Sequence, residues 1–214
     1  MYLPSLIPIF PLPNVVLFPG IPLPLHIFEP RYRDMVSDVA GGHEIIGMTL
    51  LRGDWHKDYE GWPSTFDVGC AGRIVNLERL PDGRFNIVLH GLREFTVQRH
   101  IFDKSYRQAE VAWRSGEPGT LGHPVRAALI HALSRFLASD MESPAHRLLQ
   151  DASLSDETLV NFFAYALELD PLEKQALLET SPLAARAQRL QDALEFQLEE
   201  SRLTLGGGPQ GRWH

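Results

Sequence analysis

The chain has 214 residues, of which 44% are hydrophobic and 22% are charged, and a chain of this kind can bury a core without disulfide or metal staples. Its formal net charge of −7 disfavours a nucleic-acid or anionic-membrane surface, because both ligands bind clustered Lys and Arg. The single cysteine, Cys70, excludes an intrachain disulfide and is typical of a reducing compartment. The N-terminus lacks a basic region, and no apolar run is long enough to span a membrane, so we expect a cytoplasmic protein with no membrane partner.

The first part of the chain, residues 7–35, is rich in prolines and in large apolar residues. Each proline fixes φ and lacks a backbone N–H, which excludes a regular helix before Pro30 and a central strand that runs unbroken through the segment. Proline is favoured at the first position of a helix, and Tyr32, Met35 and Val36 follow at helical spacing. We expect a helix from Pro30, preceded by three strands and a turn: Ile7–Phe10, Val15–Phe18, Pro19–Gly20 (the turn) and Leu23–Ile27.

The middle of the chain alternates apolar and polar residues and has turn signals between the runs. Glycines on either side of Cys70 suggest a bulge, and proline and glycine in Pro81–Arg84 indicate a tight turn. The segment Arg52–Pro63 is a polar loop that carries three large aromatic residues. The expected strands are Glu44–Leu51, Asp67–Leu80, Phe85–His90, Arg93–Arg99 and Tyr106–Trp113.

After Ser115–Gly122, a stretch of Gly, Pro and small residues, the composition changes to helix formers. Asp170-Pro171-Leu172-Glu173 has the form of a capping box with proline at the first helical position, and predicts a helix over Pro171–Glu179. Ser181-Pro182 opens the last helix. We therefore expect a β-rich subdomain over residues 1–116, a helical bundle over 123–202 and a disordered tail over 203–214.

The opening sequence PIFPLPNVVLFPGIPLPLHIFEPRYRDMV closely resembles the start of the N-terminal domain of Lon proteases, which recognises substrates. The shared pattern is P-L-P-x-x-V-x-F-P-G, followed by P-L-x-I/V-F-E-P-R-Y. The strand VGCAGRI, the hairpin return DGRFNIVLHGLREF and the helix LEKQALLET resemble later parts of that domain. The resemblance covers about residues 7–200. It implies an α+β fold, with a PUA-like β-barrel followed by an α-helical bundle.

The chemistry of the rest of Lon is missing from the sequence. No GxxxxGK[ST] phosphate-binding loop occurs, so we expect no ATPase module. No room remains for the serine–lysine protease domain of the family. We therefore expect no enzymatic activity and no cofactor.

The residues of the opening motif that this sequence shares with the Lon family are interpreted as structural. Glu29 is expected to stabilise the N-terminus of the helix at Pro30, and Arg31 to tie this helix to the barrel. The alternative is direct contact with a ligand. The motif residues in this sequence are Pro19, Gly20, Phe28, Glu29, Pro30, Arg31 and Tyr32.

The aromatic residues of the polar loop, Trp55, Tyr59 and Trp62, are the candidates for peptide binding. Large aromatics in such a loop either fold back onto the core or remain exposed as anchors for a partner. The sequence leaves these two alternatives open.

Four groups of residues suggest catalysis or metal binding, and each has a simpler structural explanation. A weak pattern of metal ligands occupies alternate positions of the polar loop: Asp54, His56 and Asp58. A solvated loop is the favoured interpretation, and no metal is expected. His26 and Glu29 are interpreted as a strand histidine beside a helix start. Cys70 is expected to be buried and inert. Ser143 with His146 is expected to mark a helix start.

Two classes of function follow. The first is a module that binds unfolded or apolar polypeptide segments, with a protease or chaperone as a further partner. The alternative is a binder of a small molecule or RNA, since PUA-like barrels also occur in RNA-binding proteins. The acidic balance and the lack of basic residues interleaved with aromatics disfavour nucleic acid. An enzyme is the least supported class.

Overall fold

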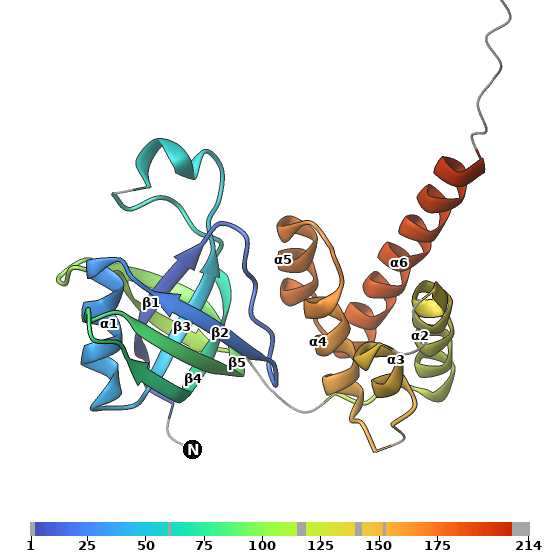
Figure 1. The fold of residues 1–214 in the computed structure, drawn as a ribbon, viewed down its shortest axis with the longest axis horizontal. Coiled ribbons are helices and arrows are strands. Elements are labelled where there is room, and N and C mark those ends of the chain that lie inside the picture. The colour runs from blue at the N-terminus through green and yellow to red at the C-terminus, as the bar shows by residue number, and fades with distance from the viewer. Residues whose placement is uncertain (1–2, 60, 115–118, 140–142, 152, 207–214) are drawn as a thin grey trace, which may run out of the picture. The chain divides into compact units, whose positions relative to one another are not determined.

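The structure is a computed structural model that describes residues 3–59, 61–114, 119–139, 143–151 and 153–206. The fold is α+β, as the sequence predicts (Figure 1). The strands are β1 Leu6–Leu12, β2 Pro22–Ile27, β3 Ile45–Leu50, β4 Val68–Arg79, β5 Phe85–Ile101 and β6 Gln108–Trp113. The helices are α1 Pro30–Ala40, α2 His123–Phe136, α3 Pro144–Leu149, α4 Asp156–Ala166, α5 Pro171–Glu179 and α6 Leu183–Gly206, with short 3-10 helices η1 Trp55–Asp58 and η2 Leu137–Ser139.

The six strands form one sheet that closes into a barrel. Their order is β2-β5-β4-β3-β1-β6, and a further pairing of β5 with β6 closes the ring. β1 and β3 are parallel, while the other pairs are antiparallel. β2 is attached to the barrel through β5 and has no second strand partner in the described part of the chain. The predicted bulge beside Cys70 is present, since the β4–β5 register shifts between Ala71 and Gly72.

Two predictions about the strands were wrong. Phe85–His90 and Arg93–Arg99 are parts of the single long strand β5, because Gly91 stays in register opposite Gly72. Val15–Phe18 is not a strand, although Val16, Leu17 and Phe18 are buried. This segment lies outside the sheet and is held at its end, where Gly20 N–H donates to the Gly91 carbonyl (2.9 Å).

The turn at Pro19–Gly20 is confirmed. Ile21 N–H donates to the Phe18 carbonyl at 3.2 Å, and Gly20 has φ of +80°. A positive φ after proline is typical of a type II turn, in which glycine is favoured at this position.

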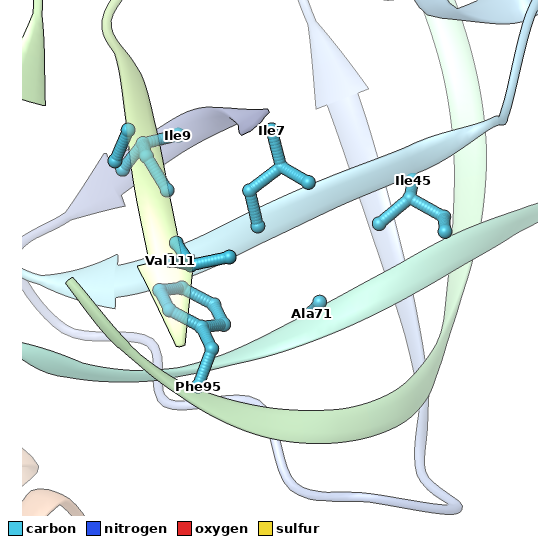
Figure 2. Packing of buried hydrophobic residues seen from close by; sticks show 7 residues of the cluster. Ile7, Ile9, Ile45, Ala71, Phe95 and Val111 are labelled. Atoms are coloured by element: carbon cyan, nitrogen blue, oxygen red, sulfur yellow. The ribbon is translucent and has the colours of Figure 1, made fainter. Parts of the chain in front are cut away.

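The barrel core contains a tight cluster of apolar side chains from five strands (Figure 2). Two glycines allow this packing, because there is no room for a side chain at either position. A Cβ at Gly47 would lie 2.8 Å from Ile9 Cδ1, and one at Gly69 would lie 2.3 Å from the Met48 carbonyl oxygen. The cluster consists of Ile7, Ile9, Ile45, Ala71, Phe95, Ala109 and Val111.

The chain forms two compact units that are not continuous in sequence. The first contains residues up to Pro118 together with Asn161–Glu179, which is the second half of α4 and all of α5. Within it, Gln175 Nε2 donates to the Val68 carbonyl (2.9 Å), and Asn161 Nδ2 donates to the Pro19 carbonyl (3.1 Å). These bonds explain why the two buried amides, Asn161 and Gln175, are tolerated in apolar helix faces.

The second unit contains Gly119–Val160 and the chain from Thr180. In it, Leu129 and Leu133 of α2, and Leu190 and Leu194 of α6, are buried. Arg126 forms an ion pair with Asp156, whose carboxylate also accepts from Leu121 N–H at 2.7 Å. The division into a β-rich subdomain over residues 1–116 and a helical bundle over 123–202 stays a prediction. Of the predicted disordered tail, residues 203–206 belong to α6, and 207–214 lie outside the described residues.

The helix starts that the sequence predicts are present. Asp170 and Glu173 form the capping box of α5: Asp170 N–H donates to Glu173 Oε2 (3.1 Å), and Leu172 N–H donates to Asp170 Oδ1 (2.8 Å). Ser143 Oγ accepts from His146 N–H at 3.1 Å and caps α3. Such caps satisfy N–H groups that the helix itself leaves without acceptors.

Gly69→Ala is expected to destabilise the barrel strongly. The new methyl group would meet the Met48 carbonyl oxygen and the Phe95 ring, at 2.3 and 2.6 Å, and such overpacking costs about 1–3 kcal/mol. Thermal unfolding measures the effect. Gly41→Ala is the matched control, because nothing lies within 4 Å of its Cβ position. Equal melting temperatures of the two variants would contradict this account of the core.

Candidate functional site

The loop between β3 and β4 is fastened to the start of α1 by a three-residue contact. Tyr59 Oη donates to Glu29 Oε1 at 2.8 Å, and the Arg31 guanidinium donates to the Tyr59 carbonyl at 3.3 and 3.4 Å. Arg31 Nε in turn donates to Glu29 Oε2 at 3.0 Å. We call Glu29, Arg31 and Tyr59 the latch. Through it the opening motif of the chain sets the position of the loop.

Glu29 stands at the N-cap position of α1, but its side chain accepts no hydrogen bond from a backbone N–H of the first turn. Its carboxylate accepts instead from the Tyr59 hydroxyl and from the Arg31 guanidinium, and the second bond is strengthened because both groups are charged. The expected electrostatic stabilisation of the helix N-terminus by this carboxylate stays a prediction. Burial and the hydrogen bond to Glu29 raise the pKa of the Tyr59 hydroxyl, so it stays protonated and donates at neutral pH.

The three aromatic residues of the loop differ in their exposure: both alternatives, folding back onto the protein and staying exposed, occur among them. Tyr59 folds back into the latch, and half-buried Trp55 lies with its edge against Tyr59 (ring centroids 5.9 Å apart). Trp62 stays 42% exposed and packs against Phe102, which is 47% exposed, with ring centroids 4.7 Å apart. Only Trp62 of the three candidates therefore presents a largely open ring.

Phe102 is a site residue that sequence reasoning missed. It follows directly after β5, within the polar stretch that connects this strand to β6. The available signal was a large aromatic residue among Asp, Lys and Ser, which is the same signal that identified the loop of Trp62. Nothing in the sequence indicated that the two segments meet.

The exposed pair Trp62–Phe102 borders an open cleft of about 560 Å³ on the barrel. The walls of the cleft include His100 and Thr65, whose Nε2 and Oγ1 atoms lie 3.5 Å apart, and Asp67. Arg52 and Asp54 lie at the same cleft. The arrangement places two apolar rings next to a set of polar and charged groups.

Arg107 lies beneath the ring pair and is only 3% exposed. Its guanidinium is 5.9 Å from the centroid of the Trp62 ring and 5.8 Å from that of Phe102, and Nη2 donates to the Pro63 carbonyl at 2.6 Å. Burial lowers the pKa of Arg107, but a guanidinium keeps its proton at any physiological pH. Sequence reasoning missed this residue, because an arginine before a strand is ordinarily exposed.

The residues considered for metal binding and catalysis are not brought together. Lys57 pairs with Asp54, the ring of His56 packs against Trp55, and the side chain of Asp58 lies outside the described part of the chain. In the described segments, no three His, Cys, Asp or Glu residues are grouped to hold a metal ion. His26 contacts Asn86 (2.7 Å) and Arg84 (3.2 Å), while Glu29 belongs to the latch. Cys70 is buried with no exposed surface.

Among the residues that the structure describes, no helix has both the length and the apolarity that a membrane span requires.

Comparison with protein families gives a match to the substrate-binding domain of the ATP-dependent protease La (LON) over residues 6–195. The Lon protease of Roseiflexus castenholzii is 30% identical over 216 residues, and that of Cytophaga hutchinsonii is 26% identical over 206 residues. These alignments cover 95% and 92% of this chain but 25% of each protease. The chain thus spans about a quarter of the length of these relatives.

Solved structures of the same domain are similar to this one. A Lon N-terminal domain protein from Xanthomonas campestris has a TM-score of 0.65 and 26% identity, and covers 90% of this chain and 98% of its own. The N-terminal domain of a Mycobacterium avium complex Lon protease has a TM-score of 0.70 at 16% identity, over 89% of this chain and 98% of its own. The second likeness is one of fold. The resemblance stated from the motifs is therefore confirmed.

Tyr59→Phe is expected to release the loop while the barrel stays folded. The variant keeps the ring but loses the donor to Glu29, a bond whose net contribution is about 1 kcal/mol at this partly exposed position. Limited proteolysis should cut faster within residues 52–63, and the melting temperature should fall by about 2–4 °C. Tyr165→Phe is the control, since its hydroxyl has no hydrogen-bond partner in the described part of the chain. Unchanged cleavage in Tyr59→Phe would contradict the latch.

His100 is expected to make the fold less stable in mild acid. Burial lowers its pKa, Arg107 adds to this effect, and Asp67 opposes it. The unfolded chain, with an ordinary histidine pKa of about 6.5, then binds more protons than the folded one, so stability falls as the pH drops through that value. His43, whose pKa burial also lowers, acts in the same direction.

The measurement is the melting temperature at pH 7.5 and pH 5.5. His100→Gln should lose less stability between these values than the parent protein, and adding His43→Gln should reduce the loss further. An identical pH dependence in parent and His100→Gln proteins would show that the fold does not lower the pKa of His100.

Proposed function

This chain belongs to the family of LON substrate-binding domains, and on that premise we propose that it is a non-catalytic module that binds polypeptide segments with exposed apolar side chains. The proposed contact surface is formed by Trp62 and Phe102, with Trp55 and Tyr59 as the adjoining wall of the loop. The expected partners are unfolded chains, and a protease or chaperone that receives them. A single buried cysteine fits a reducing, cytoplasmic setting.

The observation that carries the proposal is the exposed ring pair. Trp62 and Phe102 each leave more than 40% of their surface to solvent although they lie side by side. An aromatic pair that remains open beside a cleft gives a large contact area at a low cost in side-chain entropy. The polar groups around it keep the free protein soluble and can meet the amides of an extended chain.

The latch supports the proposal, because it fixes the loop that carries Trp62 before any ligand arrives. Loops on rigid scaffolds are common positions for binding groups. A site that is ordered in advance loses less conformational entropy on binding. The binding of small molecules or RNA is the less supported alternative, since the net charge of −7 opposes a nucleic-acid surface.

The double variant Trp62→Ala, Phe102→Ala tests the proposal. Its affinity for a permanently unfolded model protein should fall at least tenfold, because each contact aromatic usually contributes more than about 1 kcal/mol. Binding is measured by titration with fluorescence anisotropy, and circular dichroism verifies the fold.

Phe196→Ala is the matched control. Phe196 is 61% exposed on α6, so the variant removes an open aromatic ring of the same kind from the other compact unit. Its affinity should equal that of the parent protein. Undiminished binding by the double variant, or an equal loss in Phe196→Ala, would contradict the proposed surface.

A further inference from the structure

Arg107 has more hydrogen-bond donors than the fold uses. A guanidinium carries five N–H groups, and the structure gives this one a single acceptor, the Pro63 carbonyl. Its Nε atom is buried without a partner. No carboxylate forms an ion pair with Arg107 among the residues that the structure describes. A buried cation with neither a counter-ion nor a full set of acceptors is costly.

The charges around Arg107 leave the inner cleft positive. Arg31 is a near neighbour, but Glu29 balances its charge, and Asp54 is balanced by Lys57. Of the remaining charged residues that line the cleft, two are positive, Arg107 and Arg52, and one is negative, Asp67. The site therefore favours a single negative charge rather than a dianion.

A small space lies next to the guanidinium. Arg107, Arg31, Tyr32 and Trp62 are among the residues that line a cavity of about 10 Å³, which is about the volume that one water-sized atom group requires. Arg107 thus lines both this cavity and the larger cleft. An oxygen atom of a ligand fits the space by size and by the sign of the surrounding charge.

We propose that Arg107 binds a carboxylate of the bound polypeptide, while the apolar residue next to that carboxylate packs on the Trp62–Phe102 pair. The inference rests on the proposed function and narrows its substrate class to apolar segments that carry an adjacent carboxylate. The group is either a C-terminal carboxylate or an Asp or Glu side chain. Both are planar monoanions that match the fork of a guanidinium.

The geometry links the two contacts. The rings of Trp62 and Phe102 lie within 6 Å of the Arg107 guanidinium, so a carboxylate that reaches the cation lies beside the exposed ring faces. A phosphate group is disfavoured, because a dianion would meet Asp67 in the same cleft and would find only one buried arginine.

The test uses the full chain and four fluorescently labelled octapeptides with the same apolar residues. One peptide ends in a free carboxylate and its match in a carboxamide. The other two are carboxamides with Asp or Asn in the position before the last. The parent protein should bind at least one carboxylate peptide about tenfold more tightly than its neutral match, as expected of a charge-assisted hydrogen bond.

The variant Arg107→Gln should bind each carboxylate peptide and its neutral match equally. Arg52→Gln is the matched comparison, because it removes the other arginine of the same cleft, and it should lower the preference less than Arg107→Gln does. If Arg107→Gln does not fold, the Nε–H resonance of Arg107 in the parent protein is followed by NMR. It should shift with the carboxylate peptides and not with their neutral matches.

The outcomes are distinct. A gain for the free C-terminus or for Asp supports the inference and identifies the source of the carboxylate. Equal affinity of the parent for charged and neutral peptides overturns it and leaves the proposed function standing. Loss of the preference in Arg52→Gln but not in Arg107→Gln, or an unmoved Nε–H resonance, also overturns it. Binding of none of the four peptides would contradict the proposed function itself.

Discussion

The position of the candidate site depends on one contact, the carboxylate of Glu29 shared by a guanidinium and a phenol. Glu29 and Arg31 lie two residues apart at the start of α1, and Tyr59 comes from a loop thirty residues later. Both partners of the carboxylate are partly shielded from solvent, which makes their hydrogen bonds stronger than those of an open ion pair. Through this contact, a sequence motif near the N-terminus holds a loop that is distant in the sequence.

The barrel gives this support a rigid base. Five strands contribute to the apolar cluster (Figure 2). The glycines at 47 in β3 and 69 in β4 leave room for the side chains of neighbouring strands. The segment after β5 and the loop after β3 then end near each other, and Trp62 meets Phe102. Trp62 and Phe102 are forty residues apart in the sequence. They meet because the pairing of the strands brings their two segments together.

Much of the fold was predictable because its signals are local. The proline at the start of α1, the capping box of α5 and the Pro19–Gly20 turn each restrict φ or satisfy N–H groups within four residues. The errors occurred where a long-range contact decided the outcome. Apolar Val15–Phe18 looks like a strand but is buried without strand partners, and Gly91 looks like a break but stays within β5.

The site was less predictable for the same reason. The sequence indicated Trp55, Tyr59 and Trp62 as a group, because all three lie in one polar loop. Which ring folds back depends on Glu29, and which ring stays open depends on Phe102, and neither relation has a sequence signature. The burial of Arg107 was harder still to predict, because it depends on two separate segments, those that carry Trp62 and Phe102.

The sequence of the edge strand β2 bears on the proposed binding of unfolded chains. β2 pairs with β5 on one side, and Pro22 and Pro24 occupy alternate positions of the strand. Because alternate residues direct their N–H groups to the same edge, these prolines remove donors from the side that faces away from β5. The edge of β2 that faces away from β5 is therefore a poor template for adding a strand. If the protein binds unfolded chains as we propose, this edge does not favour a growing β-sheet.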